Sequence, residues 1–157
     1  MKHTLQVLVE NKFGVLARVA SLFSARGYNI DSLAVGETHD PTISCMTIVV
    51  NAEDERILEQ IKKQLNKLID VITVIDFTRK EYIDRELILL KINKREDTVG
   101  LIDKLISDYS LKVLDNKEDS CTIEVCGDSH LIEKVLQEAK KIGIKELIRS
   151  GKLAISN

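Results

Sequence analysis

The first half of the chain alternates short apolar runs with amphipathic segments of helical spacing. The predicted strands cover residues 4–9, 29–38, 43–51 and 71–77, and the predicted helices cover residues 13–26 and 54–68. Gly27 stands where it can end the first helix, because glycine adopts the left-handed conformation that helix ends often require. The order strand, helix, strand, strand, helix, strand predicts a ferredoxin-like split βαβ domain.

The second half of the chain repeats this order of elements. Its predicted strands cover residues 86–91, 111–114, 121–125 and 144–149, and its predicted helices cover residues 98–107 and 129–141. The run at residues 87–93 also resembles the run at residues 5–11. We therefore predict an α+β protein with two ferredoxin-like βαββαβ domains. The domains are predicted at residues 1–78 and 85–157, with a polar linker at 79–84. Each half is small for a lone core, so we expect dimerisation.

Composition excludes several classes of protein. The 157 residues include 23 basic and 25 acidic side chains, and the net charge of −2 offers no electrostatic footprint for nucleic acid or an anionic membrane. No apolar run approaches the roughly 20 residues that span a bilayer, and the chain begins without a signal sequence, so we predict a cytoplasmic location. The three cysteines do not suggest a disulfide framework, and Cys121 is predicted to face a core.

A search for catalytic motifs gives a negative result. The sequence has no phosphate-binding glycine loop, no dinucleotide fingerprint, no H-E-x-x-H metal motif and no G-x-S-x-G nucleophile turn. The histidines, His3, His39 and His130, lie far apart at the edges of elements, and we predict that they are surface residues. We predict neither catalytic residues nor a metal site in this chain.

One segment, residues 10–16, has the features of an anion site. Here the first strand passes into the first helix, whose N-terminus offers unpaired N–H groups and the positive end of its dipole. Gly14 lacks a Cβ, so a carboxylate can approach the backbone, and Asn11 can orient the turn or contact the ligand. The alternative is structural: Asn11 caps the helix and Gly14 permits close packing.

A second segment, residues 26–33, carries Asn29 at the start of a predicted strand, where asparagine is unfavourable. Its amide can bind the ammonium or carboxylate group of a ligand. The alternative is ordinary turn chemistry after Gly27.

Taken together, these segments resemble a known family. The motif N-x-x-G-x-L at residues 11–16, followed by R-G-Y-N-I-x-S-L at 26–33, resembles the ACT domain of acetolactate synthase regulatory subunits. The resemblance continues through residues 40–48, 58–71 and 146–151, and so covers essentially the whole chain. Cys45 is a departure, since the family usually has arginine at that position.

The resemblance implies a non-catalytic subunit that dimerises through its ACT domains and binds valine at their interface. The implied effector-binding residues are Asn11, Gly14 and Asn29, with Leu16 and Ile30 as apolar neighbours. The implied partner is the large catalytic subunit, which would carry the thiamine diphosphate, magnesium and FAD. The chain would activate that subunit and confer feedback inhibition by valine in branched-chain amino-acid biosynthesis.

The second domain lacks the motif, because Glu96 stands opposite Gly14 when the two halves are aligned on their first strands. Only the first domain is therefore expected to bind an amino acid.

Three other functions are compatible with a domain of this topology. A free-standing ACT sensor could serve another enzyme or a transcription factor. An acylphosphatase-like hydrolase would need an arginine in the first strand–helix loop, where Lys12 is the only cation. An RNA-binding domain would need aromatic side chains in the middle of the first and third strands, and none is present there.

Overall fold

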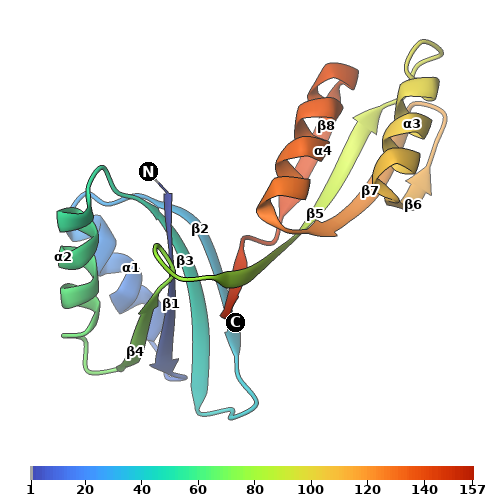
Figure 1. Cartoon of the computed structure of the whole chain (residues 1–157). Coiled ribbons are helices and arrows are strands. Elements are labelled where there is room, and N and C mark those ends of the chain that lie inside the picture. The colour runs from blue at the N-terminus through green and yellow to red at the C-terminus, as the bar shows by residue number, and fades with distance from the viewer. Residues whose placement is uncertain (1) are drawn as a thin grey trace. The chain divides into compact units, whose positions relative to one another are not determined.

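The computed structural model describes residues 2–157 and contains two compact units. The first unit runs to Ile83 and also includes Lys152–Asn157, whereas the second unit is Asp84–Gly151. Each unit has an antiparallel sheet with two helices on one face, so the predicted α+β class with repeated βαββαβ topology is confirmed (Figure 1). The predicted domain bounds, 1–78 and 85–157, stay a prediction.

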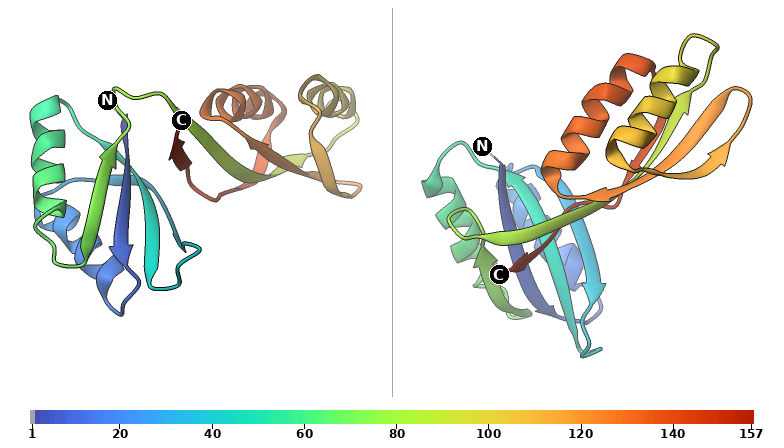
Figure 2. Two further views of the ribbon diagram at one scale, coloured as in Figure 1. Left: turned by 60° about the horizontal axis from the view of Figure 1, so that its bottom comes forward. Right: turned by 45° about the vertical axis from the view of Figure 1, so that its right-hand side comes forward.

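The first unit contains the elements β1 (Lys2–Glu10), α1 (Val15–Ala25), β2 (Ile30–Glu37), β3 (Ile43–Asn51), α2 (Glu55–Leu65) and β4 (Val71–Asp76). The sheet order is β2-β3-β1-β4, so β2 and β4 are the edge strands of this path. Both β1 and β2 pair antiparallel with β3, and they therefore run in the same direction. Figure 2 shows α1 and α2 on the same side of this sheet.

Alternation of side chains along β1 explains why the helices cover one face. Leu5, Val7 and Val9 are at most 1% exposed and belong to the core, whereas Gln6 and Leu8 between them point to the other face and are only partly buried. The helices supply the remaining core side chains: Val15, Val19, Leu22 and Phe23 from α1, and Leu58, Ile61 and Leu65 from α2. The core therefore lies between β1–β3 and the two helices.

The second unit contains β5 (Tyr82–Asn93, whose first residues belong to the first unit), α3 (Val99–Tyr109), β6 (Lys112–Asn116), β7 (Ser120–Gly127), α4 (Ser129–Ile142) and β8 (Ile144–Arg149). The strand order β6-β7-β5-β8 repeats the topology of the first unit. Cys121 is 2% exposed and lies in the core, as predicted. Residues 82–84, predicted to be linker, lie in β5, because the strand begins before the apolar run that identified it.

A final strand, β9 (Leu153–Ser156), was not predicted. Four residues are too few to establish a strand period. β9 pairs with β5 and is grouped with the first unit.

Glu86 of β5 is a buried carboxylate held by Arg149 of β8. Its side chain is 5% exposed overall, and it accepts hydrogen bonds from Arg149 Nε at 2.7 Å and Arg149 Nη2 at 2.5 Å. Two parallel N–H···O bonds from one guanidinium are a strong, geometrically specific pair. The Glu86 carboxylate raises the pKa of Arg149, so this cation keeps its charge at any ordinary pH.

We predict that Arg149→Ala destabilises the protein, because it leaves the Glu86 carboxylate buried without its cation. We expect a loss of about 2 kcal/mol in unfolding free energy, below the roughly 3–5 kcal/mol of a fully buried pair, because Arg149 is half-exposed. Urea unfolding measures this change. Lys145→Ala is the control: it lies on the same strand, but its partner Asp119 is exposed, and we expect at most about 0.5 kcal/mol. Equal effects of the two variants would contradict the prediction.

Candidate functional site

The turn between β1 and α1 is fixed by Asn11. Its backbone N–H donates to Thr42 O at 2.7 Å, and its side-chain Nδ2 donates to Pro41 O at 2.9 Å. Both bonds tie the turn to the loop between β2 and β3. Asn11 does not cap the helix: Gly14 occupies the N-cap position and α1 has no side-chain cap, so the structural alternative for Asn11 was wrong in its detail.

Gly14 is required at this turn for two physical reasons. Its φ of +80° lies in the left-handed region, which disfavours side chains. A Cβ at this position would also stand 3.0 Å from Arg18 Nη1, which is tighter than ordinary contact. The start of α1 is open to solvent on both sides of Gly14: Phe13 before it is fully exposed, and Leu16 after it is 44% exposed.

Arg18 and Asp70 form an ion pair beside Gly14 that sequence reasoning missed. Arg18 Nε and Nη2 lie 2.8 and 2.7 Å from Asp70 Oδ2, and Asp70 is only 7% exposed. The backbone of Asp70 is also bound, since Glu10 N donates to its carbonyl at 2.9 Å. No sequence signal links positions 52 residues apart, so only the fold brings them together.

The second group of predicted residues lies at the start of β2. Asn29 is exposed, and its Nδ2 donates to Asp31 Oδ1 at 2.7 Å. Ile30 is partly buried and packs against the core of the first unit. Gly27, with φ +69°, follows the end of α1, as predicted.

Within one chain, the structure does not bring the two groups together. Ile30 pairs with Val50, which pairs with His3 at the beginning of β1. Asn11, Gly14 and Leu16 instead follow Glu10 at the end of β1. The seven steps along β1 from His3 to Glu10 correspond to about 23 Å at 3.3 Å per residue. The predicted residues therefore form two half-sites at opposite ends of the first sheet.

Comparison with known proteins gives a consistent result over both units. Residues 5–73 match the model of the AHAS small subunit-like ACT domain, and residues 85–157 match that of the small subunit of acetolactate synthase. The acetolactate synthase small subunit of Mycolicibacterium smegmatis is 47% identical over 154 residues, covering 98% of this chain and 90% of the relative.

The chain belongs to the family of acetolactate synthase small subunits.

Further relatives agree with this family. The probable acetolactate synthase small subunit of Archaeoglobus fulgidus is 46% identical over 155 residues, covering 99% of this chain and 96% of the relative. The crystal structure of the small subunit from Thermotoga maritima superposes with a TM-score of 0.86 at 32% identity, covering 100% of this chain and 98% of that one. Small subunits are the regulatory subunits of acetolactate synthase. The match of residues 85–157 favours this function over a free-standing ACT sensor.

Among residues 2–157, no group of three or more His, Cys, Asp or Glu side chains lies together as a metal would require. None of the helices in this range has the length and apolar character of a membrane-spanning segment. Cys45 lies half-buried on β3, and this burial raises the pKa of its thiol.

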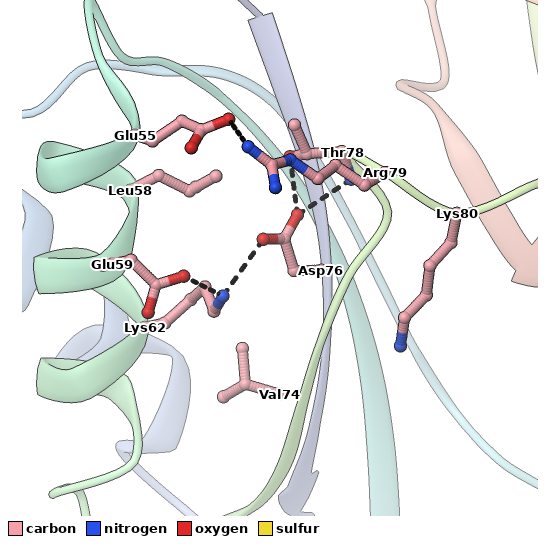
Figure 3. A pocket seen from close by; sticks show the side chains of 9 residues that line it. All are labelled: Glu55, Leu58, Glu59, Lys62, Val74, Asp76, Thr78, Arg79 and Lys80. Atoms are coloured by element: carbon pink, nitrogen blue, oxygen red, sulfur yellow. Dashed lines mark hydrogen bonds and ion pairs between the residues drawn. The ribbon is translucent and has the colours of Figure 1, made fainter.

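A hollow of about 340 Å³ lies between α2 and the segment around β4 (Figure 3). Most of its charged side chains bind one another. Lys62 is bound by Glu59 and lies 3.1 Å from Asp76 Oδ2, and Arg79 Nη2 lies 2.5 Å from Glu55 Oε1. Figure 3 shows the Lys62–Asp76 and Glu55–Arg79 pairs spanning this hollow, so they anchor α2 to the end of β4 and to the residues that follow it.

The same network reaches His3, which was wrongly predicted to be a surface residue. His3 is 2% exposed, and its Nδ1 lies 3.0 Å from Thr78 Oγ1. Thr78 Oγ1 donates its own proton to Asp76 Oδ1 at 2.6 Å, so it must accept from His3 Nδ1–H. This fixes the ring tautomer and leaves Nε2 buried without a hydrogen-bond partner in the part of the chain described.

Asp76 is the centre of this network. Partial burial acts to raise the pKa of Asp76, but the hydrogen bonds from Thr78 and Lys62 outweigh it and hold the pKa below its ordinary value. The pKa of Lys62 is raised, chiefly by the hydrogen bond to Glu59. The ionised network is therefore favoured at neutral pH.

We predict that Asp76→Asn lowers the melting temperature at pH 7, with a loss of about 1 kcal/mol, because the amide replaces an ionised acceptor. A carboxyl group whose pKa is lowered in the folded state stabilises above its unfolded value, about 3.9, and that stabilisation disappears as the pH falls through the folded pKa. The difference between wild type and variant should therefore shrink below about pH 4. Melts from pH 3 to 7 test this. The exposed Asp97→Asn is the control, and a pH-independent difference for Asp76→Asn would contradict the prediction.

Proposed function

We propose that this regulatory subunit activates the large catalytic subunit of acetolactate synthase and makes it sensitive to valine, which binds where the ACT domains of two chains meet. The observation that carries the proposal is the separation of the two half-sites within one chain. The two half-sites of one chain lie too far apart to contact the same small ligand. Half-sites from two chains can contact one ligand if the ACT domains pair.

A two-fold axis at the edge strand β2 would join the half-sites. β2 starts with Ile30 at the end of the sheet away from Gly14 and finishes with Glu37 at the near end, beside the loop that Asn11 binds. If β2 pairs antiparallel with β2 of a second chain, the start of one strand lies next to the finish of the other. Asn29 of each chain then comes to the end of the sheet that carries Asn11 and Gly14 of its partner. The same pairing removes an open sheet edge.

The chemistry of the half-sites suits a free amino acid. The N-terminus of α1, which lacks a side-chain cap, offers N–H groups and the positive end of the helix dipole to a carboxylate. Asn29 donates through Nδ2 to Asp31, so its Oδ1 can accept from an ammonium group. Leu16 and Ile30 supply apolar surface for a branched side chain. Valine needs all three kinds of contact.

The corresponding turn of the second unit supports the expectation that only the first unit binds an amino acid. Before α3, the side chain of Thr98 accepts from Arg95 N at 2.8 Å and is 3% exposed, so it fills the turn. The glycines with positive φ in residues 2–157 are Gly14, Gly27, Gly143 and Gly151, and none of them precedes α3. The turn before α3 therefore lacks the open backbone that Gly14 offers to a ligand carboxylate before α1.

In this scheme, catalysis and regulation belong to different chains. The catalytic subunit would bind thiamine diphosphate, magnesium and FAD, and this chain would bind the effector. Valine would act through different affinities for the activating and inhibiting arrangements of the complex.

We expect the purified chain alone to form no acetolactate from pyruvate, even with thiamine diphosphate, magnesium and FAD. Mixed with its cognate large subunit, it should raise the rate of acetolactate formation, and valine should then lower that rate. A colorimetric assay for acetolactate measures both effects. Turnover by the isolated chain would contradict the division of work, and a complex indifferent to valine would contradict the effector assignment.

We also expect two inactive half-sites to complement each other. Gly14→Asp places a charge beside the valine carboxylate, and like charges about 4 Å apart at an effective dielectric near 20 repel by about 4 kcal/mol, a loss of several hundred-fold in affinity. Asn29→Ala removes the opposite half-site. Each variant alone should lose valine binding.

A dimer containing one chain of each variant should regain one intact site, because both substitutions then fall in the same one of its two sites. Co-expression with two different tags isolates this mixed dimer, and calorimetric titration should find about half of the wild-type number of sites with wild-type affinity. A mixed dimer that binds no valine would show that the site lies within one chain.

A further inference from the structure

The last six residues of the chain, Lys152–Asn157, form what we call the C-terminal segment. It follows Gly151, which has a φ of +87°, and it groups with the first unit although it is separated from the rest of that unit by the whole second unit. Its strand β9 pairs with β5, and two further hydrogen bonds attach the segment to the first sheet. Lys152 N donates to Ser32 Oγ at 3.0 Å, and Gln6 Nε2 donates to Ala154 O at 3.2 Å. Figure 2 shows β9, the dark red strand at the C-terminus, next to the beginning of β5.

The C-terminal segment lies on the far face of the first sheet, the face without helices. Gln6 belongs to this face because its neighbours Leu5 and Val7 point into the helical core. Its cross-strand partner Thr47 is only 4% exposed although no helix covers it. Ala154 is 6% exposed, whereas its neighbours Leu153 and Ile155 are 54% and 61% exposed. The segment therefore turns Ala154 inward and the larger side chains outward.

Ser32, the point of attachment on β2, lies next to the second half-site. The register between β2 and β3 shifts between Ile30 and Ser32, so one extra residue, Asp31, is accommodated there. This bulge lets Ile30 and Leu33 both pack on the helical core, three residues apart, while Ser32 faces the far side. Asp31, at the bulge, is the partner of the Asn29 side chain.

We propose that the C-terminal segment positions the effector site: by binding Ser32 and the far face, residues 152–157 fix the bulged start of β2 and with it the amide of Asn29. The inference rests on the proposed function. The segment touches no ligand in this scheme, and acts through Ser32 and Asp31. Within one chain β2 is hydrogen-bonded to the sheet on one side only, and the segment adds a second attachment near the start of this strand.

Paired substitutions in the full-length chain test this. Ala154→Asp places a charge at the inward position, where it cannot be solvated, and should detach the segment. Ile155→Asp adds the same charge to the next residue, which is exposed. Titration calorimetry well below the melting temperature should show valine affinity lowered about ten-fold by Ala154→Asp, because the start of β2 is then no longer fixed, and nearly unchanged by Ile155→Asp. A folded, dimeric Ala154→Asp protein with wild-type affinity would overturn the proposal.

Ser32 provides a second test that does not depend on folding of the charged variant. Ser32→Ala removes the acceptor for Lys152 N and should weaken valine binding about five-fold, whereas Ser32→Thr keeps the hydroxyl and should restore wild-type affinity. A purely structural role would lower the melting temperature of Ser32→Ala and leave the affinity of the folded protein unchanged. That result would also overturn the proposal.

Hydrogen exchange separates failure of this inference from failure of the proposed function. Amides at residues 29–35 should exchange faster in Ala154→Asp than in Ile155→Asp, and this comparison needs no ligand. If the wild type binds no valine, the proposed function fails, and the exchange rates still decide whether the segment holds β2. Equal exchange in the two variants would show that it does not.

Discussion

The first sheet has two faces and two edge strands, and its own two helices can cover only one face. This constraint governs the rest of the first unit. The apolar residues of β1 that point to the helices are fully buried, while Gln6 and Thr47 occupy the uncovered face and need another partner. The chain provides part of that partner from its own end, through Ala154 and Lys152. The β2 edge remains, and an open edge favours pairing with another strand.

The periodic parts of the fold were predictable from sequence. The predicted boundaries of β3 and β8 agree with the structure to the residue, because β3 is an apolar run bounded by polar turns and β8 lies between Gly143 and Ser150. Cys121 was placed correctly because it alternates with buried Ile123 and Val125. β9 was missed because its burial depends on a surface formed by residues about 120 to 150 positions earlier. The four residues of β9 carry no pattern of their own that predicts contact with this surface.

The candidate site was predictable as a set of residues, and its geometry was not. Gly14 was selected for its lack of a Cβ, and its positive φ supplies the physical reason. The sequence gives no sign that Arg18 lies beside that glycine and pairs with Asp70. His3 was misjudged because its position at the start of a strand suggested exposure, whereas Thr78 and Asp76 return to cover it. Long-range contacts of this kind become visible only in the folded chain.

The position of the C-terminal segment has a consequence for how the protein is made. The first unit runs to Ile83 and also includes Lys152–Asn157, so β9 is synthesised only after the whole second unit. At about 5–20 residues per second, the ribosome needs roughly 4–15 s to add the 74 residues that follow Ile83. During that interval the nascent first unit exposes the far face of its sheet, including the positions that β9 later covers. Synthesis of β9, and not the emergence of the residues up to Ile83, is therefore the event that finishes the first unit.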